Sequence, residues 1–165
     1  MASLADTNSE IQRVTAIDVA RGVCRLLYRQ GFSSLCEVPL GNGRRADVIG
    51  LCDRGTLTLV EIKVSIADLR GDMKWPEYLD YCDRYYWAVP DFFDHELLDD
   101  LHFMPHRAGL IVADRFDAAV VRDAAVVPLN AARRKAETLR FARRAAQRLL
   151  GINDPHLQAS VSEIG

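Results

Sequence analysis

Two charged residues interrupt an apolar run that fits a β-strand better than any other element. The run covers residues 57–64, Leu-Thr-Leu-Val-Glu-Ile-Lys-Val, and is rich in β-branched side chains. Because side chains alternate along a strand, Glu61 and Lys63 point to one face and Ile62 points to the other. Unpaired charges in a core are costly, so we expect this pair to be ion-paired, to bind a metal or to line a cleft.

A hairpin can place a second acid beside this pair. Residues 53–55, Asp-Arg-Gly, separate the run from an earlier apolar run, and Gly55 suits the positive φ of a tight turn. With a three-residue loop, Asp47 lies opposite Glu61 with Cβ atoms about 5 Å apart. A two-residue loop places Asp47 opposite Ile62 instead and destroys the cluster. The sequence leaves both loop lengths open.

Two carboxylates and a lysine in one place suit phosphodiester hydrolysis. Like charges this close need a cation between them, and oxygen ligands of this kind suit Mg²⁺ or Mn²⁺. We therefore expect Asp47 and Glu61 to bind the metal, and Lys63 to assist the attacking water or stabilise charge on the phosphate. The simpler interpretation is an exposed strand face whose charges pair with their neighbours, because Glu-x-Lys alone is an unspecific tripeptide.

The motifs taken in order resemble a known nuclease superfamily. Asp47 followed by residues 61–63 resembles the Asp…(Asp/Glu)-x-Lys signature of the PD-(D/E)XK nucleases, with Ala46 in place of the proline of the name. More closely, four stretches between residues 20 and 150 resemble the MmcB-like family of bacterial DNA repair proteins; they are residues 43–48, 60–65, 72–78 and 81–83. The resemblance implies an α/β fold with a restriction-endonuclease-like core, in which helices flank a mixed central β-sheet, and DNA as the partner.

A third acid can join the metal site from either of two places. Residues 41–43, Gly-Asn-Gly, predict another hairpin. A three-residue loop there places Glu37 opposite Asp47, whereas a two-residue loop places Val38 there and leaves Glu37 an edge-strand acid. Asp18 is the rival, because nucleases of the superfamily often take an acid from their first helix.

The segment after the lysine offers contacts to a phosphate backbone. Lys74 and Tyr78 lie within about one helical turn of each other and resemble the polar-and-tyrosine motif that the superfamily often carries here. Lys74 can reach a phosphate, and Tyr78 can orient water or substrate. Arg44 and Arg45, just ahead of the first acid of the motif, are also placed for phosphate contact.

Charge is distributed unevenly along the chain. The net charge is −2, yet residues 133–150 carry seven basic side chains against Glu137 alone. Such asymmetry is typical of a surface that binds a polyanion, although a solvated helix face explains it as well. The residues of this segment that we expect to bind nucleic acid are Arg133, Arg134, Arg140 and Arg144.

Length and composition set the remaining expectations. A chain of 165 residues with 49% hydrophobic residues fits a single nuclease-like domain over residues 1–165. Residues 1–10 are interpreted as a disordered leader without a secretory signal, and no apolar run is long enough to span a membrane. Four widely spaced cysteines suit reduced thiols in a cytoplasmic bacterial protein. We expect no small-molecule cofactor, and a homodimer remains open.

Periodicity predicts the other elements. A helix over residues 14–29 precedes the hairpins, a second begins after Ser65, and a strand covers residues 85–89. A later hairpin and a long helix capped by Asn130 complete the chain. The inner stripe predicted for that last helix consists of Leu139, Ala142, Ala146 and Leu149.

The function that these features favour is a metal-dependent nuclease acting on DNA in repair. A competing hypothesis is a DNA-binding repair accessory protein that keeps the nuclease-like fold but cleaves nothing. The acid and lysine trio favours the enzyme, because a binder gains little from negative charge that faces DNA. Cleavage of RNA is a third hypothesis, which nothing in the sequence separates from cleavage of DNA.

Overall fold

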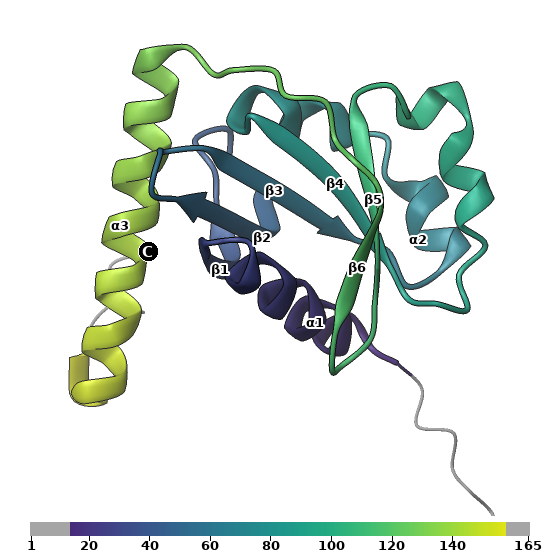
Figure 1. Cartoon of the computed structure of the whole chain (residues 1–165). Coiled ribbons are helices and arrows are strands. Elements are labelled where there is room, and N and C mark those ends of the chain that lie inside the picture. The colour runs from purple at the N-terminus through teal and green to yellow at the C-terminus, as the bar shows by residue number, and fades with distance from the viewer. Residues whose placement is uncertain (1–13, 158–165) are drawn as a thin grey trace, which may run out of the picture.

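The computed structural model describes residues 14–157 as a six-stranded sheet with helices packed around it (Figure 1). The leader predicted over residues 1–10 lies outside the described residues. The helices are α1 (Ala16–Arg29), α2 (Ile66–Gly71) and α3 (Ala131–Asn153), with short 3₁₀ helices η1 (Trp75–Tyr81), η2 (His95–Asp99) and η3 (Leu101–Phe103). The strands are β1 (Phe32–Pro39), β2 (Arg45–Cys52), β3 (Leu57–Ile62), β4 (Arg84–Val89), β5 (Ala108–Ala113) and β6 (Ala118–Arg122).

The sheet is mixed, and its strand order follows the chain from β1 to β6. Three neighbouring pairs are antiparallel hairpins, whereas β3, β4 and β5 run parallel to one another. Parallel neighbours need crossover connections, which here contain α2 with η1 and η2 with η3. The expected α/β architecture, a mixed central sheet flanked by helices, is confirmed.

Both hairpins at the start of the sheet have three-residue loops. Gly43 and Gly55 adopt φ angles of 78° and 79°, the left-handed conformation that such loops require of their last residue. The ladders on either side keep the same register. This register sets Glu37, Asp47 and Glu61 level on three adjacent strands, so the three-residue alternative is the correct one in both hairpins.

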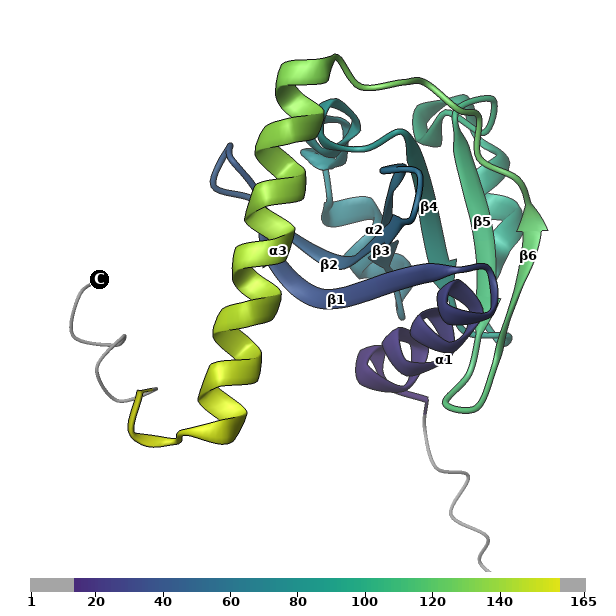
Figure 2. The same ribbon diagram turned by 60° about the vertical axis from the view of Figure 1, so that its left-hand side comes forward.

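The two faces of the sheet carry separate cores. On one face, Val19 and Val23 of α1 pack against the even-numbered side chains of β3. On the other face, Trp75 of η1 contacts Tyr85 and Trp87 of β4 at ring-centroid distances of 5.5 and 5.1 Å. Figure 2 shows α1 on one side of the sheet and α2 on the other. The odd-numbered residues of β3 therefore face the aromatic core.

The last helix is oriented differently from the prediction. In α3 the predicted inner residues Leu139 and Leu149 are 54% and 60% exposed, whereas Glu137 and Phe141 are buried. The predicted inner stripe was therefore wrong. Phe141 joins the aromatic core, and the helix lies against β1 and η1 (Figures 1 and 2). Arg133 contacts Tyr81 of η1, and Arg148 contacts Glu37 of β1. No helix within residues 14–157 is long and apolar enough to cross a bilayer.

Candidate functional site

Asp47 and Glu61 are held together by hydrogen bonds between their side chains and the opposite strand. The backbone N–H of Asp47 donates to Glu61 Oε1 at 3.1 Å, and the N–H of Ile62 donates to Asp47 Oδ2 at 2.8 Å. These bonds take over where the ladder between β2 and β3 ends. They fix both carboxylates and leave Asp47 Oδ1 and Glu61 Oε2 without a hydrogen-bond donor among the described residues.

Burial makes this pair an unfavourable place for two negative charges. Glu61 is 4% exposed, and burial together with the neighbouring Asp47 charge raises its pKa to about 9. Burial also raises the pKa of Asp47. At neutral pH the pair alone therefore binds a proton on Glu61. A cation placed between the carboxylates would favour the ionised form and release that proton.

Lys63 follows β3 and continues its ladder, because its N–H donates to the carbonyl of Ala88 at 2.9 Å. Its side chain is 8% exposed, and Nζ lies 2.8 Å from Asp72 Oδ2 and 3.9 Å from Asp68 Oδ1. Burial acts to lower the pKa of Lys63, but the hydrogen bond to Asp72 and the neighbouring carboxylates, Asp72 and Asp68 foremost, together outweigh it and the pKa is raised. Lys63 is therefore an ammonium ion near neutral pH.

Sequence analysis missed Asp68 and Asp72 as members of this site. Asp68 is the third residue of α2, and its N–H donates to the hydroxyl of the N-cap residue Ser65 at 3.1 Å. Asp72 ends α2. The only sequence signal that Asp68 or Asp72 pairs with Lys63 is that acidic residues occur in the short helix directly after the charged end of β3.

The two candidates for a third acid have other partners. Glu37 lies opposite Asp47 in the register, but its backbone has a φ of 52° and its carboxylate is 3.6 Å from Arg45. Asp18 accepts hydrogen bonds from the backbone and hydroxyl of Thr15, closing the capping box of α1, and lies 3.7 Å from Arg115. The structure thus places Asp18 in the helix cap.

The donor set determines which kind of metal site fits. Within residues 14–157, no group of three or more His, Cys, Asp and Glu side chains is arranged to hold a metal ion. The two uncommitted oxygens of Asp47 and Glu61 fit Mg²⁺ or Mn²⁺ that keeps waters and takes phosphate oxygens for its other ligands. They do not fit a closed three-carboxylate site that includes Glu37.

A groove of about 400 Å³ gives access to Asp47 from solvent. It lies between α1 and the edge of the sheet formed by the first three strands. The lining residues contributed by α1 are Ala16, Ile17, Ala20, Arg21 and Cys24, and those contributed by the strands are Cys36, Glu37, Asp47 and Ile62.

The basic residues ahead of Asp47 are held by acids. Arg44 binds Glu77 through two hydrogen bonds of 2.8 and 3.1 Å, and Arg45 lies near Glu37. The Tyr78 hydroxyl donates to the carbonyl of Arg45 at 3.2 Å, so Tyr78 supports the strand that carries Asp47. Lys74 is exposed at the start of η1.

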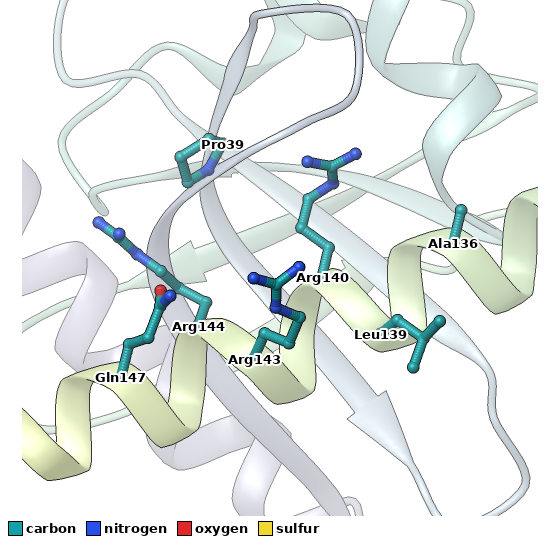
Figure 3. Close-up of a pocket in the computed structure, with 7 residues that line it drawn as sticks. All are labelled: Pro39, Ala136, Leu139, Arg140, Arg143, Arg144 and Gln147. Carbon is teal, nitrogen blue, oxygen red and sulfur yellow. The ribbon is translucent and has the colours of Figure 1, made fainter. Parts of the chain in front are cut away.

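The arginines of α3 separate into two groups. Near its start, Arg133 lies over the Tyr81 ring at 4.3 Å, and Arg134 forms hydrogen bonds of 2.7 and 2.6 Å with Asp83. These two anchor the helix. Farther along, Arg140 and Arg144 line a pocket of about 310 Å³ with Arg143 and reach toward β1 on either side of Pro39 (Figure 3).

Fold and site together define an α/β domain whose mixed six-stranded sheet carries two neighbouring carboxylates and a lysine near one strand end. A family model described as DNA repair protein MmcB-like matches residues 4–156, so the chain belongs to the MmcB-like family of DNA repair proteins. A solved protein of unknown function from Silicibacter pomeroyi is 42% identical, with a TM-score of 0.78 over 89% of this chain and 95% of that one. A repair endonuclease from Pyrococcus abyssi is 17% identical, with a TM-score of 0.39 over 61% of this chain and 46% of the other. No curated protein matches.

Proposed function

We propose that this protein is a metal-dependent nuclease that cleaves DNA phosphodiester bonds during repair. The observation that carries the proposal is the pair of half-buried Asp47 and buried Glu61, in which the carboxylates are held by the opposite strand and interact electrostatically with Lys63. The two carboxylates would hold Mg²⁺ or Mn²⁺. The metal would supply a Lewis acid for the phosphate and an acidified water.

Lys63 would stabilise negative charge rather than act as a base. Asp72 raises the pKa of Lys63, so the side chain keeps its proton near neutral pH. An ammonium group can donate to a phosphate oxygen or orient the attacking water, but it cannot accept the proton of that water. Asp72 would therefore serve to position Lys63 at the end of β3.

The DNA backbone would pass along the second group of arginines on α3. Arg140 and Arg144 border the pocket next to β1, and Arg148 donates to the carbonyl of Glu37 at 3.0 Å. Because Glu37 also lines the groove that contains Asp47, this contact joins the basic helix to the candidate site. Lys74 is exposed and would add a further phosphate contact.

Cleavage assays test the catalytic proposal. Single-stranded, nicked, branched and duplex DNA are incubated with Mg²⁺ or Mn²⁺ and the wild type, Asp47→Asn or Lys63→Met. Asp53→Asn is the matched control, because Asp53 is exposed in the loop at the opposite end of β3 from Glu61. We expect the two site variants to lose cleavage by about 100-fold or more while the control keeps it. Equal cleavage by all four proteins would refute the proposal.

Salt-dependent binding tests the DNA path. An Arg140→Gln, Arg144→Gln double variant removes two cations beside β1, and Lys135→Gln removes one exposed cation from the same helix away from the pocket. If both arginines contact phosphates, the slope of log affinity against log salt falls by about two for the double variant. The slope should not change for Lys135→Gln. A double variant that keeps the wild-type slope would place the DNA elsewhere.

A non-catalytic DNA-binding accessory protein is the second candidate. One feature favours it: burial raises the pKa of Glu61 to about 9, so the site repels a phosphate less than two ionised carboxylates would, although the Asp72 carboxylate 2.8 Å away balances the positive charge of Lys63. If the protein binds DNA in a salt-sensitive way but cleaves none of the DNA structures with either metal ion, the accessory role is supported and the nuclease function is not.

A further inference from the structure

Two cysteines from different elements meet in the wall of the groove that contains Asp47. Cys24 lies on α1 and Cys36 on β1, and their sulfur atoms are 3.6 Å apart. Both thiols are partly exposed and both line the groove, so a small solute can reach them. Cys82, by contrast, is buried in the aromatic core.

We propose that Cys24 and Cys36 form an oxidative modification site, at which a peroxide closes a disulfide between α1 and β1. A disulfide bond is about 2.05 Å long, so the two sulfur atoms need to approach by about 1.6 Å. Rotation of the side chains and a small shift of the strand provide such a movement. The two thiols are already in contact, so no intervening group has to leave.

The reaction needs only the two thiols and hydrogen peroxide. Attack of one sulfur on a peroxide oxygen breaks the O–O bond and gives a sulfenic acid, while the thiol proton leaves with the departing hydroxide as water. The second sulfur then attacks the sulfenic sulfur, the S–S bond forms and the S–O bond breaks. The second thiol proton leaves with the hydroxyl group as another water. Two thiols are oxidised, and one peroxide is reduced to two waters.

The position of Cys36 connects the disulfide to the candidate site. Cys36 directly precedes Glu37, whose φ of 52° interrupts the ladder between β1 and β2. Strands deform at such irregularities, so closing the disulfide would displace β1 there. Glu37 borders Asp47 in the groove, and its carbonyl accepts a hydrogen bond from Arg148 of α3. Oxidation would therefore move the groove wall and the contact to the basic helix together.

Mass spectrometry tests the modification itself. The reduced protein is treated with equimolar hydrogen peroxide, alkylated in denaturant and digested with trypsin. We expect a product two hydrogens lighter in which peptide 22–25 is linked to peptide 30–44, and which dithiothreitol reverses. Cys24→Ser and Cys36→Ser should lack the linked pair, and Cys52→Ser should keep it. Over-oxidation without this link, or a link to Cys52 or Cys82 instead, would overturn the proposal.

The effect on cleavage rests on the proposed nuclease function and is measured separately. We expect the oxidised wild type to cleave DNA about tenfold more slowly than the reduced form, because displacements of this size misalign reacting groups. Cys24→Ser should show no dependence on peroxide. Equal cleavage rates in both redox states would refute the proposed effect of the disulfide on the candidate site. If the protein forms the disulfide but cleaves DNA in neither redox state, the proposed nuclease function is refuted and the proposed modification site is supported.

Discussion

The pKa of Glu61 predicts how the stability of the metal-free protein depends on pH. The pKa is raised from 4.5 in the unfolded chain to about 9 in the folded protein, chiefly by burial. Between these values the folded state binds one proton that the unfolded state has lost. The contribution of Glu61 to stability is therefore complete below about pH 4.5 and falls as the pH rises toward about 9.

The size of the effect follows from proton linkage. One proton corresponds to about 1.4 kcal/mol of unfolding free energy per pH unit, so stability falls by about 2.7 kcal/mol between about pH 6 and about pH 8. Glu61→Gln has no such proton. Its amide keeps an acceptor for the N–H of Asp47, but the variant should lack this part of the pH dependence. The difference between the two proteins cancels the contributions of titrating groups that do not interact with Glu61 and leaves those of Glu61 and the neighbouring Asp47.

Urea unfolding at the two pH values, with a chelator present, measures this difference. Glu96→Gln is the control, because Glu96 is an exposed glutamate of η2 and should leave the wild-type slope unchanged. Added Mg²⁺ should stabilise the wild type more at about pH 8 than at about pH 6, since the ion replaces the proton. Wild type and Glu61→Gln with parallel pH dependences would refute the reasoning.

Three further substitutions probe the scaffold, each by its urea unfolding free energy. Asp83→Ala should lower the free energy of unfolding by about 3–5 kcal/mol, because the carboxylate is buried and accepts hydrogen bonds from two backbone N–H groups and Arg134. Asp80→Ala removes an exposed carboxylate and should lower the free energy of unfolding far less. Gly22→Ala should destabilise by about 1–3 kcal/mol or more, because a Cβ would lie 2.2 Å from a carbonyl oxygen of the turn between β5 and β6. Gly71→Ala meets no atom within 4 Å and should be neutral or slightly stabilising. Equal effects at the two glycines would contradict this packing.

The sequence predicts where the first two hairpins turn, because local chemistry decides the position of a tight turn. It leaves the loop length open, because a glycine suits the positive φ of two-residue and three-residue loops alike, and the structure shows Gly43 and Gly55 at the end of three-residue loops. Once that length is known, the position of Asp47 beside Glu61 follows without any knowledge of the remaining strands. The partner of Lys63 does not follow, because Asp72 comes close only through the path of the crossover after β3.

The orientation of α3 could not be obtained from its apolar residues. The leucines of the predicted inner stripe are exposed, and contacts made by arginines and by Phe141 decide which side faces the sheet. Long basic side chains cover apolar surface with their methylene groups, so a hydrophobicity pattern underestimates how well they pack. Arg134 reaches Asp83, a residue far away in the chain that no local pattern identifies.

The match between strand order and chain order has a consequence for biosynthesis. A chain that emerges from the ribosome can add each new strand to the one completed just before it, and no finished pair has to open for a later arrival. The strands with the candidate acids are completed early, but β1 is then left as an open edge until α3, the last element, docks against it. Nascent chains that stall before α3 therefore expose a template for aggregation at the edge next to the site.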